Sequence, residues 1–422
     1  MIGARRSGVF RRVVNYIRRR LGRAGRYSLT LFLVVRLFLS IVAAGAAAVQ
    51  PVPDTDEVYE HYIGQAQISE GVSGYLLGPW QRWDALWYTK IAHFGYDPDD
   101  GSTNLFPLYP LMMRGVGQFL GDRFLLAGII VSNLAFIGGL IYFYRLGEYE
   151  IGEAAARRAV TYLAFFPTAF FLLAPYTESL LLLCIIAAFY YARRRSWRQA
   201  GLFGLGAGLT KMPGALIAIP LLAEYLQSLK ERQLRRDSRV LLALTPAFGA
   251  LTYMLYRYLF VGDVAVLSSS YELWQPRSLL HHPFLFPASA QETWQWRFVI
   301  PWEGLFRGWE AIAQPPDVVS GIRACFELVT VVTLGVATVF AFLRLPRSYA
   351  IYMLLMFLGV LMWVDAVRPF STVYRHTLLF FPGFLLLALA GKRVWFHRLL
   401  LLSFIPLLAI FTSLFVGWYW MG

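Results

Sequence analysis

A single carboxylate, Asp84, stands in the aromatic segment RWDALWYTKIAHFGY (82–96), between long apolar stretches. A charged group held against a membrane is costly, so Asp84 is a candidate functional residue. The alternative is that it only pairs with a basic neighbour, Arg82 or Lys90. A second carboxylate, Glu178, precedes a run of leucines. There it either orients a cation or lies at a helix N-terminus, where its charge suits the dipole.

Several basic residues lie near the expected outer ends of apolar segments or in a second outer loop. They are Lys211, Arg368, Arg375, His376, Arg277, His281, His282 and Arg297. Arg binds phosphate through a bidentate fork and Lys binds it as a point charge, so the group indicates an anionic, phosphate-bearing ligand. The alternatives are contacts with lipid headgroups and solvated loop charges. For Asp365, close to Arg368, the simplest interpretation is an ion pair.

The composition identifies the class of protein. The chain is 58% hydrophobic and only 15% charged, whereas a soluble domain carries about 25% charged residues. Its net charge of +14 comes mostly from arginines in short segments between apolar runs, where they set topology and give no nucleic-acid signal. Both cysteines fall in apolar runs, and no zinc spacing, GxGxxG or Walker loop occurs. We therefore expect a polytopic membrane protein without a disulfide framework.

Eleven apolar stretches are candidate spans of an all-α bundle. They are 28–49, 124–146, 159–174, 177–192, 198–211, 213–228, 239–261, 319–343, 348–366, 373–391 and 398–420. The first is longer than the apolar core of a signal peptide, so we interpret it as a retained helix.

The arginines predict the topology of this bundle. Most short Arg-rich segments fall on one side, which is the cytoplasmic side by the positive-inside rule, as is the Arg-rich segment 1–27. Residues 28–422 then form one membrane domain with two outer loops, 50–123 and 262–318. Two interfacial helices are expected in the first loop, around 83–94 and 105–120. The apolar residues at helical spacing in the first of them are Trp83, Leu86, Trp87, Ile91 and Phe94.

At this point the sequence resembles a known family. It is similar to the PIG-V family, the GPI mannosyltransferase II group and its prokaryotic relatives, within the GT-C superfamily of membrane glycosyltransferases. The resemblance rests on RWDALWYTKIAHFGY (82–96), NLFPLYPLMMR (104–114), FFPTAFFLLAPYTESLL (165–181) and GLGAGLTKMPG (204–214), in the family's order. A weaker match is YRHTLLFFPGFLLLA (374–388).

The resemblance implies transfer of one sugar, usually mannose, from a polyprenyl or dolichyl phosphate to an acceptor hydroxyl at the non-cytoplasmic face. The family's first-loop Asp corresponds to Asp84 and its Tyr-Ser/Thr-Glu motif to Tyr176–Glu178. Its basic residue in a short helix break, often Arg, corresponds to Lys211. The Arg-dominated charge and the lack of an N-x-S/T site favour a bacterial or archaeal plasma membrane, which leaves a GPI acceptor in doubt.

The chemistry of such a transfer assigns a role to each residue. The reaction passes through an oxocarbenium-like state, and its phosphate leaving group needs cations more than a general acid. We therefore expect Asp84 to be the general base that activates a lipid or glycolipid hydroxyl. The expected donor-phosphate ligands are Lys211, Arg375 and His376. The expected supporting or sugar-binding residues are Glu178, Tyr176, Trp87, Tyr88, Arg82 and Tyr109. A single displacement inverts the sugar, and no metal cofactor is expected because the leaving phosphate is single.

Three other functions remain open. A protein mannosyltransferase of the same superfamily would differ only in its acceptor. A lipid or sugar transporter would explain the Gly- and Pro-broken spans around Lys211. A structural subunit of a membrane complex would make Asp84 dispensable.

Overall fold

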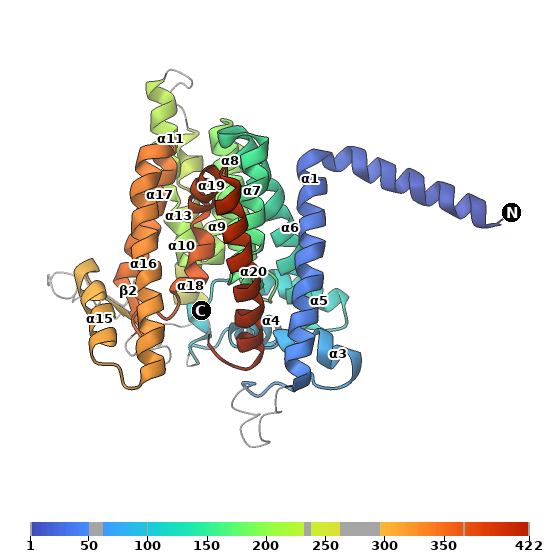
Figure 1. The fold of residues 1–422 in the computed structure, drawn as a ribbon, viewed down its shortest axis with the longest axis horizontal. Coiled ribbons are helices and arrows are strands. Elements are labelled where there is room, and N and C mark those ends of the chain that lie inside the picture. The colour runs from blue at the N-terminus through green and yellow to red at the C-terminus, as the bar shows by residue number, and fades with distance from the viewer. Residues whose placement is uncertain are drawn as a thin grey trace.

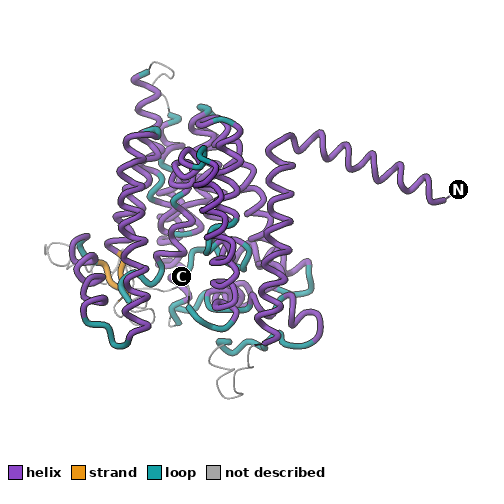
Figure 2. Tube along the Cα trace, viewed as in Figure 1, coloured by secondary structure: helices purple, strands orange, loops and turns teal. Residues whose placement is uncertain are grey.

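A computed structural model describes residues 2–49, 62–98, 100–231, 238–261, 296–365 and 368–420. Over these residues the chain is a bundle of helices, with one long helix leaving it at the N-terminus (Figures 1 and 2). That helix, α1 (Ile2–Val49), has a kink at Gly22, whose φ of 59° is a backbone conformation that glycine tolerates well. Only the part after Gly22 packs on the bundle.

Five helical segments of the described chain are long and apolar enough to cross a membrane. They are Gly22–Val49 of α1, α6 (Phe124–Ile151), the pair α10 (Met212–Ala215) and α11 (Ala218–Lys230), α16 (Val318–Arg344) and α20 (Val394–Val416). The protein is thus an integral, multi-pass membrane protein. Each segment coincides with a predicted span, although the count of eleven stays a prediction.

The other predicted spans are shorter or interrupted helices. They are α7 (Glu153–Ala164), α8 (Glu178–Arg193), α9 (Trp197–Thr210), α12 (Val240–Ala243), α13 (Thr245–Tyr256) with the π-helical turn η4 (Arg257–Val261), and α17 (Arg347–Met362). The predicted span 159–174 is wrong as one helix. The observed helix, α7, ends at Ala164. A 3₁₀ turn, η3 (Ala169–Leu172), follows Pro167.

The predicted span 373–391 is also not a straight helix. It consists of α18 (Val373–His376), the 3₁₀ turn η8 (Thr377–Leu379) and α19 (Phe381–Ala390), and it bends by 77° between η8 and α19. Pro382 lies in the first turn of α19, where its missing N–H costs no helical hydrogen bond. If the bent pair counts as one span, the described chain has up to six.

The first predicted outer loop contains short helices packed against the bundle. They are α3 (Gly71–Leu76), the 3₁₀ turns η1 (Gly78–Trp80) and η2 (Ser102–Asn104), α4 (Asp84–Phe94) and α5 (Leu108–Phe119). The helices α4 and α5 match the two expected around 83–94 and 105–120. However, Leu86 and Ile91 of α4 are buried in the protein, so the expected apolar face of α4 does not lie wholly on a membrane surface.

A small sheet departs from the all-α prediction. β1 (Trp296–Phe298) pairs antiparallel with β2 (Trp363–Asp365), with Trp296 opposite Asp365. α15 (Pro301–Ala313) follows β1 and packs on α16 and α17. Most of the second predicted outer loop lies outside the described residues.

Several connections between helices carry arginines or lysines. These basic junctions lie together at one end of the bundle. Figure 1 shows the α6–α7, α16–α17 and α19–α20 junctions at that end, and α3 and α4 towards the other. Buried Glu224 of α11 accepts hydrogen bonds there from Arg193, Arg195 and Ser348, and Glu150 of α6 binds Arg193. The predicted grouping of basic segments on one side is therefore seen in the fold.

Candidate active site

The helix α4 begins at Asp84, at the end of the bundle away from the basic junctions. The preceding residue, Trp83, has a φ of 52°, which is rare for a residue other than glycine and costs about 1–3 kcal/mol. Its ring packs edge-on against Trp418 and Trp420 after α20. This packing places a carboxylate that is only 7% exposed at a helix N-terminus, where the dipole favours it.

Arg375 of α18 joins the two candidate carboxylates. Its Nη1 donates to Oδ2 of Asp84 at 2.6 Å, and its Nε donates to Oε1 of Glu178 at 2.6 Å. All three residues are buried, Glu178 completely. The segment 373–391 bends by 77° after η8, and η8 contacts α8.

Lys211 extends this cluster by one more cation. It lies in the break between α9 and α10, in an extended conformation, and its Nζ is 2.9 Å from Oε1 of Glu178. The side chains therefore alternate in charge in the order Asp84, Arg375, Glu178, Lys211. Lys211 has the most exposed side chain of the four, at 25%.

Aromatic rings support the guanidinium of Arg375. Its Cζ lies 4.7 Å from the ring centroid of Tyr176 and 5.4 Å from that of Phe171, within cation–π distance. Two buried polar atoms of the cluster, Nη2 of Arg375 and Oε2 of Glu178, have no hydrogen-bond partner among the described residues. Such atoms are costly unless a ligand supplies a partner.

The simple pairing of Asp84 with Arg82 or Lys90 is wrong. Arg82 instead donates to the carbonyls of Val416, Gly78 and Gln81 and to the hydroxyl of Tyr62, so it fastens the first loop to the end of α20. Lys90 pairs with Asp100 at 2.8 Å.

The predicted aromatic residues lie at different depths. Half-buried Trp87 carries the ammonium of Lys90 over its ring, at 5.4 Å. Tyr88 is buried and its hydroxyl donates to Thr177. Burial and the charges of Asp84 and Glu178 raise the pKa of Tyr88 above its ordinary value. The Tyr88 hydroxyl therefore stays protonated and can donate a hydrogen bond.

Tyr109 and Tyr176, both predicted as supporting or sugar-binding residues, are fully buried. Tyr109 is fully buried behind Tyr88, with its hydroxyl on Ser132 and the carbonyl of Gly128. The hydroxyl of Tyr176 donates to the carbonyl of Arg82, while its ring supports Arg375. Both tyrosines hold the site together from behind.

Among the other predicted basic residues, the structure describes the side chains of His376 and Arg368. Half-buried His376 follows Arg375, and its Nδ1 lies 3.3 Å from Oγ1 of Thr372. The guanidinium of Arg368 binds Glu327 at 2.8 Å, and its backbone N–H donates to Asp365, so the expected pairing with Asp365 involves the main chain. Arg277, His281 and His282 lie outside the described residues.

Phe171 was not predicted as part of the site, and Thr177 was included only as the middle residue of the motif Tyr176–Glu178, without a role of its own. Both lie in the family-like segment 165–181, but a phenylalanine among apolar neighbours gives no signal of a cation–π contact. Within the ranges that the structure describes, no three His, Cys, Asp or Glu side chains are arranged to hold a metal ion.

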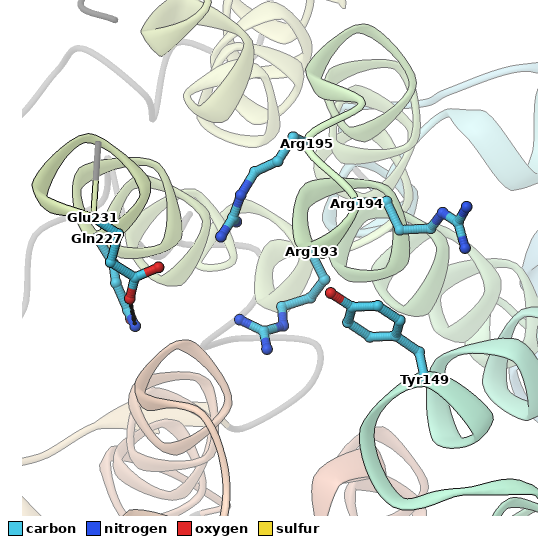
Figure 3. A pocket seen from close by; sticks show the side chains of 6 residues that line it. All are labelled: Tyr149, Arg193, Arg194, Arg195, Gln227 and Glu231. Carbon is cyan, nitrogen blue, oxygen red and sulfur yellow. Dashed lines mark hydrogen bonds between the residues drawn. The ribbon is translucent and has the colours of Figure 1, made fainter. Parts of the chain in front are cut away.

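A polar pocket of about 500 Å³ opens at the basic end of the bundle (Figure 3). Its lining residues are Tyr149, Arg193, Arg194, Arg195, Gln227 and Glu231. Glu150 and Glu224 already engage Arg193 and Arg195. The pocket is a full α8 length from Glu178, about 22 Å at 1.5 Å per residue, so it is separate from the Asp84 cluster.

The fold and the charged cluster define a multi-pass membrane protein with a candidate enzyme site at one end of its bundle. A family model described as Mannosyltransferase (PIG-V) matches residues 26–261, more than half of the chain. The chain therefore belongs to the PIG-V mannosyltransferase family and is a membrane glycosyltransferase. A comparison with curated proteins finds no match.

Solved structures of two glycosyltransferases are similar at low identity. ArnT from Cupriavidus metallidurans bound to undecaprenyl phosphate has 14% identity and a TM-score of 0.44, covering 95% of this chain and 77% of that one. The Archaeoglobus fulgidus oligosaccharyltransferase complexed with Zn and sulfate has 13% identity and a TM-score of 0.44. That match covers 90% of this chain, which spans only 53% of the oligosaccharyltransferase.

Proposed function

We propose that the protein transfers one sugar, mannose, from a polyprenyl phosphate to a hydroxyl of a lipid or glycolipid acceptor. The observation that carries the proposal is the bridge from Asp84 through Arg375 and Glu178 to Lys211, in a chain of this family. It places a base candidate beside cations suited to a phosphate leaving group.

The donor phosphate would lie against the basic side of this bridge. Lys211 offers a partly exposed ammonium, and Arg375 offers the unpaired Nη2. His376 borders the same segment and completes the proposed set of phosphate ligands. Preorganised cations that meet the charge developing on a leaving group are often the largest contribution to catalysis. Glu178 holds both cations in place.

Asp84 would act as the general base. Arg375 fixes its Oδ2, whereas its Oδ1 has no hydrogen-bond partner among the described residues. Oδ1 would take the proton of the acceptor hydroxyl as that oxygen bonds to the anomeric carbon. The bond from this carbon to the phosphate oxygen breaks, and polyprenyl phosphate leaves. A single displacement of this kind gives an α-linked product from a β-linked donor.

The surrounding residues would shape the acceptor side. Half-buried Trp87 and the neighbouring Tyr88 would line the sugar site, while Tyr109, Tyr176 and Arg82 support them. The proposed reaction needs no metal cofactor, because a single phosphate leaves and two cations stand ready. The location at the end opposite the basic junctions supports a site that faces outward from a bacterial or archaeal plasma membrane.

The test is mannose transfer by the purified full-length protein, with polyprenyl-phosphate-mannose as donor and a membrane lipid extract as acceptor. We expect folded Asp84→Asn and Asp84→Ala to lose transfer, with a lower melting temperature than the wild type because Arg375 loses a buried carboxylate partner. The matched control is Asp122→Asn, at an exposed turn between α5 and α6. Turnover of Asp84→Ala at the wild-type rate would sink the proposal, and the product's mass would identify the acceptor.

A further inference from the structure

Another cation, Arg36, lies in the first membrane span. The proposed transfer gives it no role. Arg36 is the one charged residue in the apolar stretch 28–49, and an 18-residue window of the span Gly22–Val49 has a mean hydropathy of 2.3. An ionisable residue inside a membrane span is a candidate functional site, because its charge is expensive without a partner.

Arg36 lacks the partners that other buried arginines have. Its guanidinium makes a cation–π contact with Trp80, with Cζ 5.0 Å from the ring centroid. The Nη1 atom is buried without a hydrogen-bond partner, and no carboxylate in the described ranges forms an ion pair with Arg36. By contrast, Arg82 donates to three carbonyls and Arg375 to two carboxylates. Arg36 therefore has donor capacity left for a ligand.

Its position is open to lipid and close to the Asp84 segment. On α1, Val35 and Leu39 are buried in the protein, whereas Leu33 and Leu37 are more than half exposed. Half-buried Arg36 thus lies at the edge between the bundle and the surrounding membrane.

The cation–π contact connects Arg36 to the loop that places Asp84. Trp80 ends η1, four residues before Asp84, and is almost fully buried. The helix α1 contacts both η1 and α20. In the view of Figure 1, the labels of α1 and α10 stand on opposite sides of α4.

We propose that Arg36 binds the phosphate of a membrane lipid, at a site distinct from Lys211. Phosphate is the anionic group of a membrane lipid, and a guanidinium binds it by charge-assisted hydrogen bonds. The cation–π contact with buried Trp80 holds the guanidinium beside the turn that leads to Asp84. Two lipid sources share this chemistry, a glycerophospholipid-type acceptor and the polyprenyl phosphate. The assignment of either to transfer rests on the proposed function, whereas the binding site does not.

The test measures lipid binding, not transfer. Full-length protein in detergent is titrated with phosphatidylglycerol and, separately, with sugar-free undecaprenyl monophosphate, and bound lipid is counted by native mass spectrometry. The variants are Arg36→Gln, Arg36→Lys and the control Arg145→Gln. Arg145 is an exposed arginine with a similar cation–π contact, to Tyr142 at 5.9 Å.

We expect Arg36→Gln to weaken binding of at least one lipid about tenfold, and Arg145→Gln to change neither. Loss confined to phosphatidylglycerol identifies a glycerophospholipid, and loss confined to undecaprenyl phosphate identifies the donor lipid. Wild-type affinity for both lipids in folded Arg36→Gln overturns the proposal.

Arg36→Lys keeps the charge but loses the fork, so we expect an intermediate affinity. If Arg36→Gln does not fold, wild-type affinity of Arg36→Lys for both lipids counts against the site. A failure of mannose transfer in any variant leaves these binding constants unaffected, so the two proposals can fail separately.

Discussion

The Nη1 atom of Arg375 lies 2.6 Å from Oδ2 of Asp84, although the two residues are 291 positions apart in the chain. The same guanidinium holds Glu178, which in turn holds Lys211. Two negative and two positive groups thus balance before any substrate binds. Since each carboxylate meets a cation, the cluster can be buried at a tolerable cost, and the open positions on Arg375 and Lys211 remain for a phosphate.

Arg375 binds Glu178 and Asp84 through two different nitrogens of its guanidinium, so replacement by lysine should break one of these two contacts. A lysine keeps the charge but presents one ammonium, which cannot reach Asp84 and Glu178 in the same geometry. We expect Arg375→Lys to lower kcat at least a hundredfold, measured with polyprenyl-phosphate-mannose. The control is Arg368→Lys, since Arg368 binds Glu327 through one nitrogen. A wild-type kcat for Arg375→Lys would exclude a fork-dependent role.

Lys211 is the most exposed cation of the cluster, so its loss should affect donor binding first. We expect Lys211→Ala to raise the apparent KM for the lipid donor or lower kcat, by about tenfold, and Lys211→Arg to retain more activity. Lys230→Ala, at the far end of α11, is the control. If donor dependence is unchanged in Lys211→Ala, the residue does not belong to the phosphate site.

Close packing of α9 on α13 holds the helix break that carries Lys211. A Cβ added at Gly208 would overlap the carbonyl oxygen of Pro246 in α13. We therefore expect Gly208→Ala to lower the apparent melting temperature, although alanine favours a helix by up to about 1 kcal/mol. In Gly115→Ala on α5 the new methyl group meets nothing within 4 Å, so stability should not fall. Equal melting temperatures for the two variants would contradict the tight contact.

The Lys90–Asp100 pair predicts a pH dependence. Burial raises the pKa of Asp100, but hydrogen bonds from Lys90 and Ser102 lower it overall, below its ordinary value of 3.8. A lowered folded-state pKa stabilises the protein above pH 3.8, and this contribution disappears as pH falls through the folded value.

The corresponding variant is Asp100→Asn, compared with the wild type by melting temperature from pH 7 to pH 3. We expect the wild type to be more stable at pH 7, by up to about 1 kcal/mol, and the difference to shrink as the pH falls below 3.8 towards 3. Asp122→Asn should show no such trend. A difference that is constant over the whole pH range would mean that the Asp100 charge is not its cause.

Local patterns predicted the helices near the site better than the pairings within it. The expected helix 83–94 is observed as Asp84–Phe94, because its apolar spacing is helical and Gly95 ends it. The 77° bend in 373–391 was missed, since hydropathy alone does not distinguish a straight helix from two short ones. Arg375 lies in the short helix before that bend.

Pairings between distant residues depend on tertiary structure. Nothing in the spacing of Arg82, Asp84 and Lys90 shows that a residue 291 positions away is the partner of Asp84. Glu178 left two interpretations open, and the structure combines them: it begins α8 and binds two cations. The same applies to Phe171, whose ring carries Arg375 but whose sequence context is only apolar.

At the opposite end of the bundle, Glu224 predicts a purely structural effect. Completely buried, it accepts hydrogen bonds from Arg193, Arg195 and Ser348, and so ties α11 to α8 and α17. Glu224→Gln leaves these donors with a weaker, uncharged partner. We expect the free energy of unfolding to fall by about 2 kcal/mol, read as a lower apparent melting temperature. The exposed Glu231→Gln, which only removes the charge from the acceptor of a hydrogen bond from Gln227, should leave that temperature unchanged. Glu224 binds Arg193, and α8 separates Arg193 from Glu178 by about 22 Å, so kcat of folded Glu224→Gln at low temperature should equal that of the wild type. A large loss of kcat without loss of stability would instead couple the basic end to the Asp84 cluster.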